Sequence, residues 1–232
     1  MSLHSITRNI SVALILACAL FPGVSFAAII GGVEFPQGEI SFADGVVSYD
    51  PAYSGGAIPS PSNSEPSNAL GLPEVPGNTS IGACSGDPSD CPFVSLGSGG
   101  QLVLEFVDNV LTGSDSSDLD LWIFEVGPDV EDTYVDISSN GVDWFSVGKV
   151  FGTTSGIDID SFGFTSADTF SYLRLMDDPL EGGTGGASVG ADIDAVGAIT
   201  TRAVSVPEPA SIFLILLGLI GFGVVSGRQR SM

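Results

Sequence analysis

Histidine and basic side chains are nearly absent from this chain, and their absence excludes several kinds of site. The 232 residues contain one His, which is His4 in the apolar N-terminal region. The rest of the chain therefore cannot form a Ser-His-Asp or Cys-His catalytic site, or a His-ligated zinc, copper or iron centre. Six Lys and Arg stand against 28 Asp and Glu. So few cations cannot neutralise phosphates, and we expect the protein to bind no nucleic acid.

Cysteine is also scarce. Of the three Cys, Cys18 lies in the apolar N-terminal region, and Cys84 and Cys91 enclose the stretch "CSGDPSDC". Outside the cytoplasm, two cysteines this close together are expected to form a disulfide that closes a small loop. A metal or redox role is disfavoured, because no further thiol or imidazole is available to assist.

The N-terminal segment has the features of a secretory signal. Arg8 precedes an apolar run from Ile10 to Phe21, and Ser25-Phe26-Ala27 follows with the small-x-small pattern that signal peptidase requires. We predict a signal peptide over residues 1–27 that signal peptidase removes. The alternative is a retained N-terminal membrane anchor, for which the apolar run is short.

A second apolar segment lies near the C-terminus. Residues 210–227 contain no charge and are just long enough to span a bilayer as a helix. Arg228 and Arg230 follow, and basic residues remain on the cytoplasmic side, so we expect everything before Val206 to lie outside. In front of the apolar segment, Pro207 and Pro209 exclude helix around Glu208 and hold an extended peptide. A plain anchor after a proline-rich linker is the alternative.

These three parts, in this order, resemble the PEP-CTERM sorting signal over residues 206–230. In that family the tripartite tail is read by exosortase, a membrane Cys protease or transpeptidase of Gram-negative bacteria that make extracellular polysaccharide. The resemblance implies export across the inner membrane, transient anchoring by the helix, and a final place at the cell surface or in the extracellular matrix. The recognition tag and basic stub would be Val206, Pro207, Glu208, Pro209, Arg228 and Arg230.

The segment between the two signals, residues 28–205, is the length of one domain. It holds 27 of the 28 acids and three bases, a formal net charge of −24. Hydrophobic residues make up 44% of the chain, enough to bury a core. Short runs rich in Val, Ile, Phe and Thr alternate with clusters of Gly, Pro, Asp, Asn and Ser, which favours an all-β sandwich. The predicted strands are residues 43–49, 101–106, 119–126, 133–138, 145–150, 170–176 and 192–200. Residues 50–96 are predicted to form a long surface excursion held by the disulfide.

One hairpin is well marked. Asn140-Gly141 lies between two alternating segments in "TYVDISSNGVDWFSVGKV", and Asn-Gly accepts the positive φ of a tight turn. Trp144, just after the turn, is expected to plug the end of the core.

The same stretch resembles the strand–turn–strand of discoidin or coagulation-factor type C domains and their galactose-binding-like relatives. Residues 171–175 resemble the "R-Y-[VIL]-R" strand of those domains, and residues 67–71 resemble their "A-x-N-A-x-D-G" opening. Asn140 stands where Asp is usual, and Gly71 stands where Asp-Gly is usual. The resemblance implies an eight-stranded jelly-roll β-sandwich whose activity is binding rather than catalysis.

Carboxylates occur in three Asp-x-Asp pairs, which are Asp118/Asp120, Asp158/Asp160 and Asp192/Asp194. Residues two apart on a strand point to the same face, so each pair projects two like charges together. Such charges repel unless water screens them or a cation lies between them. Ca²⁺ takes six to eight hard oxygen ligands, and two converging pairs would supply half of them. The alternative for each pair is a solvated acidic surface.

The resemblance also orders these candidates. Galactose-binding-like relatives often place a structural Ca²⁺ between the start of the sandwich and an acid on the last strand. This implies Asp192 and Asp194 as ligands, with Asn68 as their partner. Asp118 and Asp120 are the next candidates.

Two further interpretations concern glycans. Paired carboxylates can cleave glycosidic bonds when one has a raised pKa in an apolar cleft, and Glu105 and Glu125 lie in apolar runs. Solvent-facing strand edges explain these glutamates more simply. Tyr49 and Tyr53, beside the Pro/Gly-rich excursion, are the candidates for stacking on sugar rings.

Together these features favour a non-catalytic binding or structural component of the extracellular polysaccharide matrix, with Ca²⁺-assisted glycan binding. The alternatives are a secreted carboxylate-dependent hydrolase, similar to a glycosidase, and a surface protein that binds no sugar.

Overall fold

The computed structural model describes residues 27–75, 81–127, 131–182, 185–199 and 201–203. The predicted membrane helix, the sorting motif and all but the last residue of the signal peptide lie outside these ranges. Within the described ranges, no helix has the length and hydrophobicity needed to cross a membrane.

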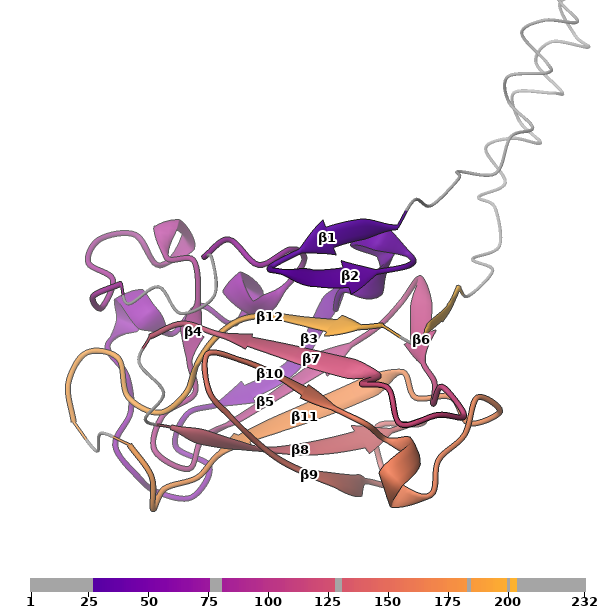
Figure 1. The fold of residues 1–232 in the computed structure, drawn as a ribbon. Helices are drawn as coiled ribbons and strands as arrows, with labels where there is room; N and C mark the ends of the chain where they lie inside the picture. The colour runs from indigo at the N-terminus through magenta and orange to yellow at the C-terminus, as the bar shows by residue number, and fades with distance from the viewer. Residues whose placement is uncertain (1–26, 76–80, 128–130, 183–184, 200, 204–232) are drawn as a thin grey trace, which may run out of the picture.

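Two antiparallel sheets pack face to face and form a β-sandwich (Figure 1). The four-stranded sheet has the order β10 (Thr154–Ile157), β7 (Leu121–Glu125), β12 (Asp192–Ala198), β4 (Val94–Ser95). The five-stranded sheet has the order β3 (Gly45–Asp50), β5 (Gln101–Glu105), β11 (Tyr172–Asp177), β8 (Asp132–Ser138), β9 (Phe145–Phe151).

The chain crosses repeatedly from one sheet to the other. The eight strands other than β3 have the orders β4-β12-β7-β10 and β5-β11-β8-β9, which is the jelly-roll arrangement of two Greek keys. The predicted all-β jelly-roll sandwich is therefore confirmed. Strand alternation builds its core, because side chains two apart point inward together. On β11, for example, Leu173 and Leu175 are fully buried and Arg174 points to the outer face.

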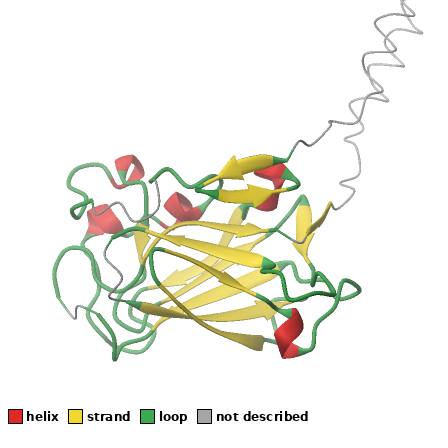
Figure 2. Ribbon diagram, viewed as in Figure 1, coloured by secondary structure: helices red, strands yellow, loops and turns green. Residues whose placement is uncertain are grey.

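Small elements complete the domain. A hairpin of β1 (Ala28–Ile30) and β2 (Val33–Phe35) packs on the four-stranded sheet through the clustered rings of Phe35, Phe42 and Phe124. Strand β6 (Asn109–Leu111) pairs with β13 (Thr201–Ala203). The described helices are short 3₁₀ turns in the connecting loops (Figure 2), namely η1 (Gly38–Ser41), η2 (Pro61–Asn63), η3 (Pro66–Ala69), η4 (Pro88–Asp90) and η5 (Asp160–Phe162).

All seven predicted strands are present, with ends shifted by up to two residues. The strands that sequence reasoning missed have two to four residues each. Such short segments show too few alternations to reveal a period of two.

The disulfide between Cys84 and Cys91 is formed, as predicted. Cys91 is buried beside Phe93 and Val126, so the bridge ties the excursion to the sandwich. The excursion itself is not all surface, because Val94 and Ser95 form strand β4. That part of the prediction is wrong, since these residues supply an edge of the four-stranded sheet.

The β8–β9 hairpin is present, but its connection has six residues rather than a tight turn. Gly141 has a φ of 72° there, and the Asn140 side-chain oxygen accepts hydrogen bonds from the N–H groups of Val142 (2.8 Å) and Asp143 (2.9 Å). Trp144 does not plug the core. It lies over the guanidinium of Arg174, with 4.6 Å from Cζ to the ring centre, because the wider turn carries it over the outer face of the sheet.

Candidate metal centre

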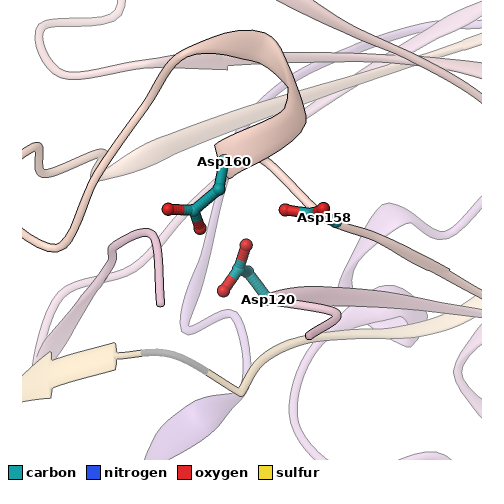
Figure 3. A group of neighbouring side chains, drawn as sticks. All are labelled: Asp120, Asp158 and Asp160. Carbon is teal, nitrogen blue, oxygen red and sulfur yellow. The ribbon is translucent and has the colours of Figure 1, made fainter. Parts of the chain in front are cut away.

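Three carboxylates from two of the Asp-x-Asp pairs meet at one end of the sandwich. Oxygen atoms of Asp120, Asp158 and Asp160 all lie within 4.8 Å of one another, and Figure 3 shows the side chains pointing toward a common centre. The pairing of β10 with β7 explains the meeting. Ile157 is opposite Leu121, so the residues that follow β10 lie beside the residue that precedes β7.

Asp120 is the buried member of the cluster, with no exposed surface. Its Oδ2 accepts a hydrogen bond from the Ile159 N–H at 2.9 Å. Its own N–H donates to the Ile157 carbonyl (2.8 Å), and its carbonyl accepts from the Ile199 N–H (2.7 Å). The Asp120 backbone is therefore held from both sides, and its carboxylate is held by the segment that follows β10.

Asp160 is held by the loop that follows β6. Its Oδ2 accepts from the N–H (2.8 Å) and the hydroxyl (3.2 Å) of Ser114, and its Oδ1 accepts from the Asp115 N–H (2.9 Å). Asp115 has a φ of 58°, and its carboxylate accepts from the N–H (3.0 Å) and the hydroxyl of Ser166. These hydrogen bonds join the two loops to each other and fix the position of the Asp160 carboxylate.

The cluster opens onto a surface depression of about 560 Å³. Half-buried Asp158 and Asp160 line it, together with Asp115, Ser116, Ser117, Ser161, Gly163, Phe164 and Thr165. The available donors are carboxylate, hydroxyl and carbonyl oxygens. This set fits a hard cation such as Ca²⁺ and does not fit metals that prefer thiolate or imidazole.

Only one member of the Asp118/Asp120 pair belongs to the cluster. Asp118 is exposed, and its carboxylate accepts a hydrogen bond from the Ser116 hydroxyl at 2.8 Å. Both residues precede β7, so the same-face rule for strands does not apply to them.

Asp192 and Asp194 each hold a different loop. Asp192 accepts from the hydroxyls of Ser95 and Ser188, both at 2.5 Å, and burial raises its pKa to about 6. Asp194 accepts from the N–H groups of Glu74 (3.0 Å) and Val75 (2.9 Å), and burial also raises its pKa to about 6.

Asn68, the expected partner of these two aspartates, donates its side-chain amide to the carbonyls of Pro88 (3.0 Å) and Phe93 (3.3 Å). In all three residues, the side chain forms hydrogen bonds that hold a neighbouring loop in place. A metal at this place stays a prediction.

The aromatic candidates differ in exposure. Tyr49 packs against the core and donates its hydroxyl to the Ser95 carbonyl at 2.6 Å, and burial raises its pKa to about 12. Tyr53 lies in the turn after β3 and is 56% exposed. Of the two, Tyr53 is the one with an open ring.

The two glutamates considered for hydrolysis lie on different sheets. Glu105 is half-buried at the end of β5, and Glu125 is 6% exposed on β7. Neither lines the depression beside Asp160.

The acidic jelly-roll domain lies between an N-terminal and a C-terminal apolar segment. Residues 205–230 match the PEP-CTERM protein-sorting motif, so the chain carries an exosortase sorting signal, as its sequence predicted. The motif implies an exported protein that is membrane-anchored and then reaches the cell surface.

Comparison with curated proteins gave no significant match. Among solved structures, the C-terminal domain of a chitobiase from Bacteroides fragilis is similar, with 15% identity, 46% of this chain and 64% of that chain covered, and a TM-score of 0.28. The match thus spans less than two thirds of that domain, and its TM-score is too low to identify the ligand or the activity.

Proposed function

We propose that the protein is a non-catalytic component of the extracellular polysaccharide matrix of a Gram-negative bacterium, and that Ca²⁺ assists its binding to glycan. The sorting motif supports delivery to the cell surface. The convergence of Asp120, Asp158 and Asp160 beside an open depression is the observation that carries the proposal.

Electrostatics favours a cation in the cluster. Two unit charges 4 Å apart interact by about 4 kcal/mol at an effective dielectric constant of about 20. Three carboxylates within 4.8 Å repel one another accordingly, and a divalent cation turns this repulsion into attraction. Asp120 would bind the ion from the protein interior, and Asp158 and Asp160 would bind it from the surface side.

The three carboxylates leave part of a Ca²⁺ coordination shell open, because the ion takes six to eight oxygens. Serine hydroxyls of the depression, water or sugar hydroxyls would complete it. Phe164 lines the same depression and packs edge-on against Phe170, with 4.9 Å between ring centres. An apolar ring beside hard oxygen ligands suits a sugar, which offers both hydroxyls and a C–H face.

The rival interpretation is a secreted hydrolase that uses Glu105 and Glu125. Glycoside cleavage needs two carboxyl groups that flank one bond. Their location on different sheets, away from the depression, supports binding over catalysis.

The test is retention of residues 28–205, which include nearly all described residues, on the host's extracellular polysaccharide with Ca²⁺ and then with a chelator. We expect retention that chelation lowers and that Asp158→Asn weakens, without release of sugar. Asp118→Asn is the matched control, because Asp118 lies outside the cluster. Release of reducing sugar that Glu105→Gln or Glu125→Gln abolishes would favour the hydrolase instead.

A further inference from the structure

The outer face of the five-stranded sheet carries both of the basic side chains that the structure describes. Arg174 lies on the central strand β11 and Lys149 on the edge strand β9. The segment 28–205 has only three bases against 27 acids. Two of the three bases lie together on this face, which sets it apart within an acidic domain.

Each of these cations lies over an aromatic ring. The Arg174 guanidinium is 4.6 Å from the centre of the Trp144 ring, and it donates two hydrogen bonds to Asp136 Oδ2, at 2.9 Å from Nε and 2.5 Å from an Nη. The turn that precedes Trp144 is held by the side chain of Asn140. Trp144 remains half-exposed, so the ring is fixed by its contact with Arg174 and still reaches solvent.

The second pair is built in the same way. Lys149 Nζ lies 5.4 Å from the centre of the Tyr134 ring and forms ion pairs with Asp132 (2.5 Å) and Asp178 (3.0 Å). The Tyr134 hydroxyl donates to Asp178 at 3.0 Å, and the side chain is 39% exposed.

A third ring extends the row. Tyr172 is two residues before Arg174 on β11 and therefore points to the same outer face. It lies beneath the hairpin turn, because a Cβ atom at Gly141 would be 3.7 Å from its ring. Tyr134, Trp144 and Tyr172 thus place three half-exposed rings on one face, among fixed carboxylates and cations.

The charge of this face limits what it can bind. Asp132, Asp136 and Asp178 outnumber Lys149 and Arg174, and the domain as a whole has a formal charge of −24. Polyanions such as acidic polysaccharides or nucleic acids are repelled. A neutral polysaccharide meets no such repulsion. The C–H faces of its pyranose rings pack on aromatic rings. Its hydroxyls form hydrogen bonds with carboxylates and a guanidinium, which still accept or donate such bonds while they are ion-paired.

We propose that this sheet face is a Ca²⁺-independent binding surface for neutral polysaccharide, separate from the carboxylate cluster. It rests on the proposed glycan-binding function and adds a second point of attachment to it. Because ion pairs and ring contacts already fix the side chains, little rotamer freedom is left to lose on binding.

The experiment measures retention of the exported chain, purified in mild detergent, on immobilised neutral β-glucan and galactomannan in the presence of a chelator. We expect Trp144→Ala to lower the affinity at least tenfold, Tyr134→Ala to lower it severalfold, and Trp144→Phe to retain part of it. Ile29→Ala is the matched control, because Ile29 is an exposed hydrophobic side chain on β1, in the hairpin that packs on the four-stranded sheet. Circular dichroism and the melting temperature establish that each variant is folded.

Two results would overturn the proposal. One is wild-type affinity in folded Trp144→Ala and Tyr134→Ala variants. The other is retention that is lost entirely on chelation or in Asp158→Asn. That result would support Ca²⁺-assisted binding at the carboxylate cluster and would show that the sheet face binds no polysaccharide. If the wild-type chain is retained on no polysaccharide under any condition, both proposals fail.

Discussion

The backbone N–H of Ile159 donates a hydrogen bond to Oδ2 of Asp120 at 2.9 Å. Through this bond, the residue between Asp158 and Asp160 is held against the buried carboxylate that precedes β7. The two flanking aspartates consequently lie on the solvent side of Asp120, where their oxygens come within 4.8 Å of its own. One backbone contact thus brings the Asp158/Asp160 pair and Asp120 into a single cluster.

We predict that Ca²⁺ raises the melting temperature of the domain through this cluster. A ligand that binds only the folded state at 100 times its Kd stabilises it by about 2.7 kcal/mol. Asp158→Asn removes a negative charge from the cluster, and it should reduce the Ca²⁺-induced shift strongly. The Asp158 carboxylate has a long 3.3 Å hydrogen bond from the Ser161 N–H, so its replacement should disturb the fold little. Thermal unfolding with Ca²⁺ and with a chelator measures the shift. Equal shifts in Asp158→Asn and Asp118→Asn would show that any bound Ca²⁺ lies elsewhere.

The second prediction concerns pH. Burial raises the pKa of Asp192 and of Asp194 from 3.8 to about 6, so the folded state binds these protons more tightly than the unfolded state does. The stability contributed by the two groups is therefore fully present below about pH 4 and falls as the pH rises through about 6. Asp192→Asn removes the buried charge and still offers hydrogen bonds to the Ser95 and Ser188 hydroxyls. It should raise the free energy of unfolding at pH 7.5 by an amount on the order of 2 kcal/mol.

Urea unfolding at pH 4.5 and pH 7.5 measures this effect. The wild-type domain should lose more stability between the two pH values than Asp192→Asn does. Asp90→Asn, at an exposed position, should leave the difference unchanged. A variant that is less stable than wild type at pH 7.5, with the same loss between the two pH values, would show that Asp192 stabilises the fold as an anion.

The sequence was a good guide to long regular features and a poor one to contacts between distant residues. Seven strands, the β8–β9 hairpin and the disulfide followed from alternation, Asn-Gly and cysteine spacing. Strand β10 has four residues and gave no alternating signal, so its pairing with β7 was not predicted. That pairing is what brings Asp158 and Asp160 to Asp120. The pairs were visible in the sequence, but their meeting depends on register.

Trp144 illustrates a second limit. A Trp after a hairpin is an obvious core candidate by hydrophobicity, yet a ring can also pack on a guanidinium at the surface. The choice here depends on a six-residue turn and on Arg174, which lies three strands later in the chain. The local sequence pattern around Trp144 reveals neither the length of the turn nor the position of Arg174.

Removal of the disulfide gives the third prediction. Cys84 and Cys91 are seven residues apart, and closing a loop of this size stabilises a domain by roughly 2.5 kcal/mol in the chain-entropy description. The double variant Cys84→Ser/Cys91→Ser should lose about this amount, measured by urea unfolding. A reducing agent should lower the stability of the wild type by a similar amount and leave the variant unchanged. A reductant effect on the variant would point to a cause other than the disulfide.

The fourth prediction concerns the sorting motif, which matches over residues 205–230. Strand β13 ends at Ala203, three residues before Val206 in the sequence. We expect Glu208→Ala to block processing in an exosortase-producing host, because Glu208 lies between the two prolines of the expected recognition tag. The precursor should then accumulate in the membrane fraction at a larger apparent mass, while the cell-surface fraction falls severalfold. Val204→Ala, just before the matched residues, is the matched control. Normal processing of Glu208→Ala would mean that the apolar segment and Arg228 are sufficient for recognition.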